Sequence, residues 1–323
     1  MSTTHLETDL DLVVLSRRDA ADGVVTLDLG RPDGSLLPTW EPGAHVDLHL
    51  GTDGGAMVRQ YSLCGDPADR ARWRIAVLLE STGRGGSRCV HYELVAGSAV
   101  RVRGPRNHFP FNSGGHYLFI GGGIGITPLI PMMNAATAAG AEWSLAYGGR
   151  SRQSMAFIDE LVAAYGDHVV VHPQDTHGLL DLAGLLGTPL ADTHVYCCGP
   201  GPLLDAVESM CAGWPSGALH IERFAPKAAG DRVVAGPFEV EVVSTGRVLT
   251  VAPEQTVLEV LQNNGLFVDS SCEEGTCGSC EVAVVDGAID HRDSVLTAEE
   301  RDEGKLMMVC VSRSACPRLV LDL

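Results

Sequence analysis

Four cysteines in the last part of the chain have the spacing of an iron–sulfur site. They follow the pattern C-x4-C-x2-C with a distant fourth member: Cys272, Cys277, Cys280 and, after 29 intervening residues, Cys310. A plant-type 2Fe–2S cluster takes four thiolates at such spacing, two on each iron. Gly275 and Gly278 would let the backbone curl so that N–H groups face the sulfurs. The spacing therefore predicts a 2Fe–2S centre.

Other interpretations of the cysteines stay open. C-x2-C alone is also half of a zinc site or a redox dithiol, although zinc sites usually pair two such units. Cys316 is a rival fourth ligand, but Cys310 directly follows the apolar run 306–309. Cys64, Cys89 and Cys211 have no partner at ligand spacing, so we expect ordinary buried thiols there.

Two short segments upstream suggest a phosphate ligand. Residues 59–63 read R-Q-Y-S-L at a predicted strand end, a weak signal alone. Residues 83–87, G-R-G-G-S, come just before a predicted helix. Backbone N–H groups at a helix start, with a hydroxyl and an arginine, make a phosphate cradle. A flexible glycine turn explains the second segment equally well.

A second glycine run, residues 121–128 with the sequence G-G-G-I-G-I-T-P, follows a predicted strand and opens a helix. Glycines in that setting permit close approach of a pyrophosphate. The run is not the usual Rossmann fingerprint, and a structural glycine turn is the alternative. Residues 198–200, C-G-P, end another predicted parallel strand, where ligands gather in such sheets.

In this order, and with G-P-R-N-H-F at residues 104–109, the motifs resemble the phthalate dioxygenase reductase family of the ferredoxin–NADP reductase-like superfamily. The resemblance covers essentially the whole chain. It implies that Tyr61 packs on the isoalloxazine of a flavin and that Ser62 hydrogen-bonds near flavin N5. It also implies a flavin phosphate site made by Arg59, Arg84, Gly85, Gly86 and Ser87. Family members with a C-terminal ferredoxin characteristically use FMN and related reductases use FAD, so we expect FMN.

The same resemblance assigns the second glycine run to a nicotinamide nucleotide. It implies a site for NADH made by Gly122, Gly123, Ile124, Gly125, Thr127, Pro128, Cys198, Gly199 and Pro200. Cys198 would lie beside nicotinamide C4 and flavin N5, with Cys197 pointing away, and Phe224 would cover the flavin. We therefore expect Ser62, Cys198 and Phe224 in the catalytic centre, although Phe224 could also be a core residue near a boundary.

Different residues favour NADH and NADPH. Arg150 and Arg152, after a predicted strand, could reach a 2′-phosphate, which would suit NADPH. Asp175, after the next strand, could instead repel that phosphate. Similarity to the family favours NADH.

Segments with different patterns of predicted strands and helices must position these residues. Residues 10–112 hold short apolar or alternating runs separated by Gly, Pro and Asp, which is typical of a small antiparallel barrel. We expect strands there at 11–15, 24–29, 45–50 and 73–79, and a helix from Ser87 through Val95. Residues 116–224 alternate strands with helices, which predicts a parallel sheet covered on both faces. We expect strands there at 117–120, 144–147, 168–172 and 194–198.

The fold class is therefore multidomain. We expect a flavin-binding antiparallel β-barrel at 1–113, an NAD-binding α/β domain at 114–226, a linker at 227–236 and an α+β ferredoxin domain of β-grasp type at 237–323. In the last domain, a hairpin of strands 238–243 and 247–251 and a helix at 257–263 lead into the cysteine loop.

Charge and composition narrow the class further. A formal net charge of −18 argues against a nucleic-acid partner. The chain starts without a basic and apolar leader, and its most apolar segment, 117–133, is broken by glycines and prolines, so we expect no membrane span. Ten cysteines in such a chain indicate a reducing compartment, and we expect a soluble cytoplasmic protein.

The parts predict a reductase. A hydride carries two electrons and a 2Fe–2S cluster accepts one, so a flavin belongs between them. We expect an NADH-dependent component that serves a terminal oxygenase, either a Rieske-type aromatic-ring oxygenase or demethylase or, alternatively, a haem-thiolate monooxygenase. A redox-sensing interaction protein is a different class, against which the complete flavin and nicotinamide motifs weigh. Residues 237–323 hold 16 acids and 6 bases, a net charge of −10, so we hypothesise steering to a basic patch on the oxygenase.

Overall fold

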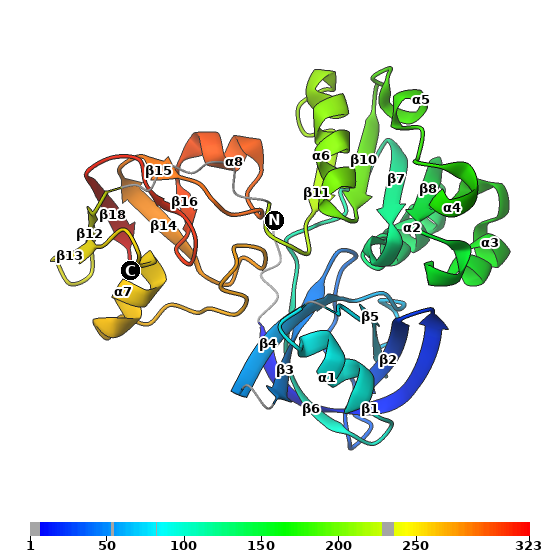
Figure 1. Cartoon of the computed structure of the whole chain (residues 1–323), viewed down its shortest axis with the longest axis horizontal. Coiled ribbons are helices and arrows are strands. Elements are labelled where there is room, and N and C mark those ends of the chain that lie inside the picture. The colour runs from blue at the N-terminus through cyan, green and yellow to red at the C-terminus, as the bar shows by residue number, and fades with distance from the viewer. Residues whose placement is uncertain (1–6, 53–54, 82, 228–235) are drawn as a thin grey trace. The chain divides into compact units, whose positions relative to one another are not determined.

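The computed structural model describes residues 7–52, 55–81, 83–227 and 236–323. The chain divides into two compact units, Met1–Glu222 and Arg223–Leu323, and each holds its own sheets (Figure 1). The expected linker, apart from its first and last residues, lies outside the described residues. The expected boundary at 113 falls between two sheets of the first unit, and the domain limits stay a prediction.

A six-stranded antiparallel sheet of order β4-β3-β6-β1-β2-β5 forms the first half of Met1–Glu222. Its strands are β1 Thr8–Ala21, β2 Val24–Gly30, β3 His45–Thr52, β4 Gly55–Ser62, β5 Trp73–Leu78 and β6 Ala99–Arg106. A bridge between Leu63 and Ile75 links its two edges, and register shifts along β1 bend it. Every second residue of β3, Val46, Leu48 and Leu50, packs into the enclosed core. The predicted antiparallel barrel is confirmed.

One helix, α1 Gly86–Tyr92, packs against this barrel through Cys89 and Val90. The predicted helix was too long, because it continued to Val95. Leu94 reaches the core from the irregular segment after the helix, and Val95 is left exposed.

Five parallel strands of order β11-β10-β7-β8-β9 complete the first unit. They are β7 His116–Gly122, β8 Trp143–Gly149, β9 Val169–Pro173, β10 Thr193–Cys198 and β11 Leu219–Glu222. The helices are α2 Leu129–Ala138, α3 Ile158–Tyr165, α4 Gln174–His177, α5 Leu182–Leu186 and α6 Gly201–Met210. Tyr147 and Tyr196 pack with α2 and α3, while Ile120 and Val195 pack with α5 and α6. Both faces are covered, as predicted, but β11 is short and of mixed polarity and was not predicted.

Arg223–Leu323 folds around a mixed sheet of order β13-β12-β18-β14-β16, and β15 pairs with β17. Its elements are β12 Phe238–Val242, β13 Arg247–Val251, α7 Val257–Asn263, β14 Glu281–Asp286, β15 Ile289–Asp290, α8 Ala298–Glu303, β16 Leu306–Met308, β17 Arg313–Ser314 and β18 Arg318–Asp322. The hairpin and α7 are confirmed. A capping box starts α7, because the Thr256 hydroxyl accepts from Glu259 N–H (3.1 Å) and the Glu259 carboxylate from Thr256 N–H (2.8 Å).

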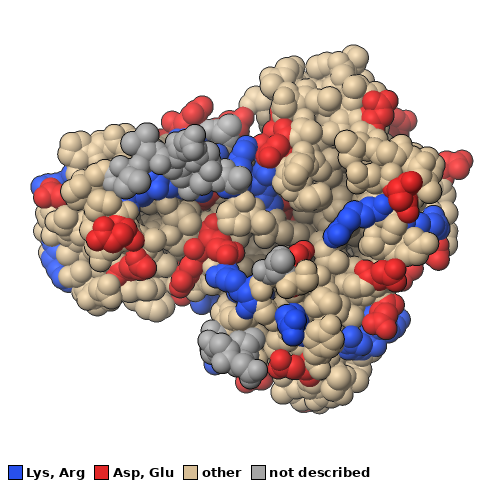
Figure 2. Space-filling model, viewed as in Figure 1, with Lys and Arg blue, Asp and Glu red and all other residues tan. Residues whose placement is uncertain are grey.

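The surface carries charges of both signs, and Figure 2 shows groups of Asp and Glu on the displayed face of Arg223–Leu323. Within the described part of the chain, no helix has both the length and the apolar character that crossing a bilayer requires.

Candidate functional site

The carboxyl ends of β4, β10 and β11 bring three side chains together. Ser62 ends β4, is buried and donates a hydrogen bond from its hydroxyl to Oε2 of Glu222 across 3.5 Å. Glu222 ends β11 and pairs in register with Cys198, the last residue of β10. Ser62 and Cys198 were predicted site residues, whereas Glu222 had no predicted role. An acidic residue at the carboxyl end of a parallel strand was the signal that could have found it.

The carboxyl group of Glu222 is enclosed by protein, although the residue as a whole is partly exposed. Burial raises the pKa of Glu222 to about 8, and the hydrogen bond from Ser62 opposes this only in part. Glu222 is therefore mostly protonated at pH 7. A carboxyl group kept neutral in this way can donate a hydrogen bond as well as accept one.

Cys198 is fully buried and remains a thiol. Burial, with Glu222 and Cys197 nearby, raises the pKa of Cys198 well above its usual value. Cys198 packs in the core on the α2 side of the sheet and Cys197 in the core on the α6 side. The prediction that the two thiols point apart is confirmed. Cys198 is thus a small, polarisable, neutral side chain and does not act as a nucleophile.

Glycines let the loops after β7 and β10 touch through their backbones. A Cβ on Gly125 would lie 2.3 Å from the carbonyl oxygen of Cys198, and a Cβ on Gly199 would lie 2.9 Å from Cα of Gly122. Gly123 differs, because its φ is +55° and nothing lies within 4 Å of the Cβ position. The contact between the loops therefore requires glycine at 122, 125 and 199, and residue 123 is the open position.

Contacts within the protein also fix the other residues of the glycine run. Thr127 is buried, and its hydroxyl donates to the carbonyl oxygen of Ile124 (3.0 Å). Pro128 precedes α2 as its N-cap, and a Cβ on Gly122 would meet the ring of Pro200 at 2.7 Å. These residues shape the two touching loops after β7 and β10, and their contact with a nucleotide stays a prediction.

The predicted phosphate segment lies against Arg59. A Cβ on Gly86 would be 2.6 Å from Cγ of Arg59, so glycine lets the arginine lie along the start of α1. Gly85 has φ +96°, a left-handed conformation that favours glycine. The Ser87 hydroxyl accepts from Glu80 N–H (3.0 Å), which leaves its own proton available to an acceptor. The structure thus brings Arg59, Gly85, Gly86 and Ser87 together.

Two further predicted flavin residues flank this segment. Tyr61 packs against the barrel core, and burial raises the pKa of its hydroxyl, which therefore stays neutral. Arg84 is exposed beside Gly85. An aromatic face on β4 and a cation on the adjoining loop are the groups that an isoalloxazine and a phosphate need.

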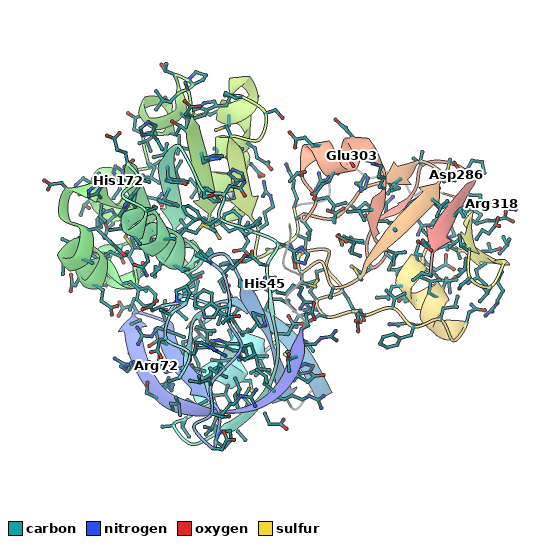
Figure 3. The ribbon with its side chains drawn as sticks, turned by 180° about the vertical axis from the view of Figure 1, so that it is seen from behind. His45, Arg72, His172, Asp286, Glu303 and Arg318 are labelled. Atoms are coloured by element: carbon teal, nitrogen blue, oxygen red, sulfur yellow. The ribbon has the colours of Figure 1, made fainter. Side chains whose placement is uncertain are left out.

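A buried polar network braces the strands next to Ser62. His45, labelled in Figure 3, faces Ser62 in the β3–β4 register. Arg106 forms an ion pair with Asp47 (2.6 Å) and donates from Nε to Nε2 of His45 (3.4 Å), and Gln60 donates to Asp47 (2.9 Å). Burial, and then the charge of Arg106, lower the pKa of His45 to about 3. His45 is therefore neutral, and the network holds this strand end without a net charge.

Phe224 is 45 % exposed and lies just beyond the end of the first unit. Its predicted place over the flavin stays a prediction.

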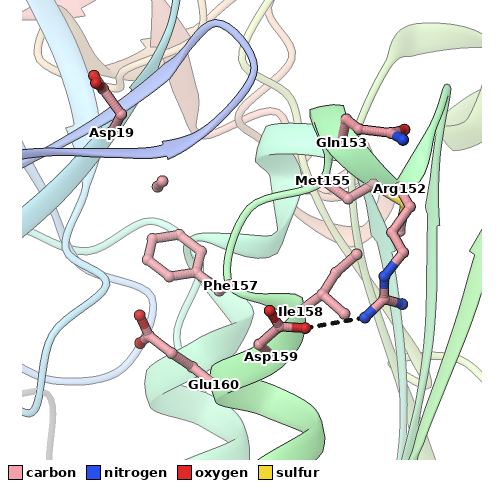
Figure 4. Close-up of a pocket in the computed structure, with 9 residues that line it drawn as sticks. Asp19, Arg152, Gln153, Met155, Phe157, Ile158, Asp159 and Glu160 are labelled. Carbon is pink, nitrogen blue, oxygen red and sulfur yellow. Dashed lines mark hydrogen bonds and ion pairs between the residues drawn. The ribbon is translucent and has the colours of Figure 1, made fainter.

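A cleft of about 300 Å³ lies where β1 meets the start of α3 (Figure 4). It is lined by Asp19, Ala20, Arg152, Gln153, Met155, Phe157, Ile158, Asp159 and Glu160 and shares no residue with the strand ends above.

Two contacts bear on the residues predicted to choose between NADH and NADPH. Arg152 forms an ion pair with Asp159 (3.0 Å). The N–H of Asp175 donates to the carbonyl of Arg150 (3.1 Å), which puts an acid near the end of β8. An acidic side chain near the end of β8 would repel a 2′-phosphate and so suits NADH better than NADPH.

The four predicted ligand cysteines are buried in Arg223–Leu323 and form two pairs. The thiol of Cys272 interacts with that of Cys277, and the thiol of Cys280 with that of Cys310. No group of three or more His, Cys, Asp or Glu side chains among the described residues has the arrangement of a site for a single metal ion. A 2Fe–2S cluster instead takes two thiolates per iron, which matches the pairs. The donor set fits that cluster.

Backbone geometry supports these thiols. Glu274 N–H donates to Sγ of Cys272 (3.3 Å), and the Ser279 hydroxyl lies 3.0 Å from Sγ of Cys277. Three loop residues adopt positive φ: Glu273 (+55°), Gly275 (+71°) and Gly278 (+73°). The predicted curl at the two glycines is confirmed, and it directs N–H groups toward sulfur.

Cys316, the rival fourth ligand, makes other contacts. Its sulfur accepts from Ala288 N–H (3.1 Å) and donates to the carbonyl of Arg318 (3.0 Å). Cys310 is placed beside Cys280 because Val309 N–H donates to the carbonyl of Cys280 (3.2 Å). Outside this loop, Cys64, Cys89 and Cys211 are buried thiols, as predicted.

Two protein-family models match the chain. The oxidoreductase NAD-binding domain matches residues 119–209, from β7 to α6. The 2Fe-2S iron-sulfur cluster binding domain matches residues 240–315, which hold the four cysteines.

Relatives match the chain almost from end to end. It is 42 % identical over 305 residues to the phenoxybenzoate dioxygenase subunit beta of Ectopseudomonas oleovorans, covering 94 % of each chain. It is 40 % identical to the vanillate O-demethylase oxidoreductase of Pseudomonas putida, covering 97 % of this chain and all of that one. It is 38 % identical over the full length of both chains to the phthalate dioxygenase reductase of Burkholderia cepacia. The chain belongs to the phthalate dioxygenase reductase family.

Solved structures agree with this family. A phthalate dioxygenase reductase, described as modular for electron transfer from pyridine nucleotides to [2Fe-2S], matches with a TM-score of 0.71 and 37 % identity over 98 % of both chains. An intact type IV self-sufficient cytochrome P450 monooxygenase matches with a TM-score of 0.91 and 44 % identity. This chain is covered to 98 % there but spans only 41 % of that monooxygenase.

As a phthalate dioxygenase reductase-family member, the chain is an NADH-dependent oxidoreductase and the reductase component of a multicomponent oxygenase. Its cofactors are FMN and a 2Fe–2S cluster, with NADH as electron donor. Its electron acceptor is a terminal oxygenase. The cofactor predictions are confirmed.

Proposed function

We propose that this reductase passes electrons to a Rieske-type aromatic-ring oxygenase or demethylase. The supporting observation is the match to relatives named for a phenoxybenzoate dioxygenase and a vanillate O-demethylase, of which the matched region makes up 94 % and 100 %. In both, the module corresponding to this chain is essentially the entire subunit. Ten cysteines, none of them in a disulfide, suit the cytoplasm as the site of this reaction.

The proposal assigns roles to the side chains at the strand ends. Tyr61 and Ser62 hold the isoalloxazine, the segment beside Arg59 holds its phosphate, and the loops after β7 and β10 position the nicotinamide next to Cys198. The flavin, when bound, accepts a hydride and gives up electrons singly. Glu222, held neutral, places no buried negative charge beside Ser62 during the reaction. Positioning, and not acid–base chemistry, is the main task of these residues.

Reconstitution tests the acceptor. The purified, fully loaded reductase is mixed with NADH and with one of three purified oxygenases: a Rieske-type dioxygenase, a Rieske-type demethylase or a haem-thiolate monooxygenase. Substrate turnover per NADH consumed is then measured. We expect coupled turnover with a Rieske-type oxygenase. NADH oxidation without product in both Rieske-type mixtures would contradict the proposal.

The haem-thiolate acceptor is the second candidate, favoured by the 44 % identity to the self-sufficient P450 monooxygenase. In that case only the third mixture forms product.

The acidic C-terminal unit is proposed to steer the encounter. Its net charge of −10 over residues 237–323 would attract a basic oxygenase surface. We expect the rate of acceptor reduction to fall as ionic strength rises, while flavin reduction by NADH changes little. A salt-independent encounter would contradict steering.

A further inference from the structure

Phe267 is the most exposed large apolar side chain in the described part of the chain, with 84 % of its surface in solvent. It lies between the end of α7 and the first cluster cysteine, Cys272. The chain turns sharply at Gly265, which has φ +74°, and Leu266 N–H donates to the carbonyl of Leu261 (3.0 Å). The helix therefore ends in a defined way, as glycine C-caps do.

Alternation along this segment forces the phenyl ring outward. Leu266 packs against the core of the unit and Val268 is 5 % exposed within it. In an extended chain, successive side chains point to opposite sides, so Phe267 and Asp269 face solvent. The ring is outside because its two neighbours are inside.

The segment is also held at both ends. The guanidinium of Arg247 donates to the carbonyl (2.9 Å) and to Oδ1 (2.7 Å) of Asn264. The amide of Gln262 reaches the hydroxyl of Ser270 (3.5 Å). Phe267 is thus presented from a braced backbone, which limits the conformational entropy lost if the ring inserts into another surface.

Several acidic residues lie near Phe267 in the sequence. Glu259 on α7, Asp269 and Glu273 are exposed, and the unit carries the excess of acids counted above. A single exposed apolar residue needs no explanation by itself. An aromatic ring within an acidic setting, five residues before a cluster ligand, has the composition of an interface anchor with a charged rim.

We propose that Phe267 and the acidic residues beside it form the docking surface for the terminal oxygenase. The partner would offer an apolar socket rimmed by Lys and Arg. The charges would raise the encounter rate, and the ring would fix the register once the surfaces meet. The inference rests on the proposed function, since it requires a separate oxygenase as acceptor.

The test compares Phe267→Ser with Val285→Ser. Val285, in β14 of the same unit, is 62 % exposed and serves as the matched control. Turnover is measured against the concentration of the Rieske-type oxygenase that couples to the wild type. For Phe267→Ser we expect KM for the oxygenase to rise about tenfold or more. NADH-to-ferricyanide activity, flavin-to-cluster transfer and cluster absorbance should match the wild type, and Val285→Ser should behave as the wild type throughout.

Charge is tested separately with Asp269→Asn. This variant should weaken the salt dependence of KM, whereas Phe267→Ser should keep it, because the ring and the rim act at different stages of association. Equal salt dependence in Asp269→Asn and the wild type would remove Asp269 from the surface.

The remaining outcomes overturn the inference in distinguishable ways. An unchanged KM in Phe267→Ser, with coupled wild-type turnover, removes Phe267 from the docking surface. Slower flavin-to-cluster transfer with unchanged KM assigns the ring to contact with the flavin-bearing unit of the same chain. If the wild type couples to no Rieske-type oxygenase, the proposed function fails as well, before any variant is made.

Discussion

The strand-end site of Met1–Glu222 and the cysteine loop of Arg223–Leu323 are built in opposite ways. Three of the four predicted cluster ligands come from one nine-residue loop, 272–280. Ser62 and Glu222, in contrast, are 160 residues apart in sequence and meet only through the fold. A cluster needs four identical donors at fixed spacing, whereas a hydride-transfer site needs surfaces from different elements. The first can be recognised locally and the second cannot.

Glycine shows the same difference. Gly275 and Gly278 adopt positive φ, so the cysteine loop uses glycine for its backbone freedom. Gly125 has no such φ, and its hydrogen side chain is required because the backbone of Cys198 is too close. Gly125 thus answers a packing requirement alone, whereas Gly275 answers a backbone requirement and a packing one, because its Cβ would lie 2.5 Å from Cγ2 of Val311.

The largest expected effect is on the cysteine loop. Cys310→Ser should abolish the visible absorbance of the cluster, because one iron loses a thiolate. NADH-to-ferricyanide activity should remain, since the proposed flavin site lies in the other unit. Cys316→Ser is the control and should keep the cluster. Retained absorbance in Cys310→Ser, with loss in Cys316→Ser, would reverse the assignment of the fourth ligand.

Gly125→Ala should damage the proposed nicotinamide site. Its Cβ would lie 2.3 Å from a backbone oxygen, so one of the two loops must move. A displacement near 1 Å would slow flavin reduction by about 100-fold. Gly201→Ala, where nothing lies within 4 Å, is the control. Stopped-flow reduction by NADH measures both, and a wild-type rate in Gly125→Ala would show that the loops are not in tight contact.

Cys198→Ala should have a smaller effect. Removing the thiol should leave the fold of the strand end intact but open space beside the proposed nicotinamide position, and we expect flavin reduction about tenfold slower. Flavin content should barely change. Cys197→Ala faces the opposite side of the sheet and should reduce at the wild-type rate. Equal single-turnover rates in all three proteins would remove Cys198 from the site.

Glu222→Gln should alter a pH profile with little effect at pH 7. In the wild type, ionisation of Glu222 near pH 8 puts a buried negative charge beside Ser62, so flavin reduction should slow as pH rises through that value. The glutamine variant should not show this step. A step at the same pH in both proteins would assign it to another group.

The same variant reports on stability. The pKa of Glu222 is about 8 in the fold against a usual value of 4.5, so the folded state binds the extra proton between those values. The free energy of unfolding should therefore fall as pH rises from 4.5 to 8, by about 1.4 kcal/mol per unit for this group. Below pH 4.5 the carboxyl group is protonated in both the folded and the unfolded state, so it adds no pH dependence to the free energy of unfolding. Urea unfolding at pH 5 and pH 8 should show this loss in the wild type relative to Glu222→Gln.

The sequence by itself determined the elements that depend on neighbours in the chain. The cysteine spacing, the capped helix α7 and the alternating β3 are local patterns of period, turn and donor type, and their physics acts over a few residues. The order of motifs likewise indicated the family and its cofactors.

Only the tertiary structure decided which distant groups share an environment. The raised pKa of Glu222 requires enclosure by elements far apart in sequence, and no spacing encodes that burial. The need for glycine at 125 arises from a second strand end, and the exposure of Phe267 from its neighbours turning into a core. Burial and contact are properties of the packed chain, so they appear only once the elements are assembled.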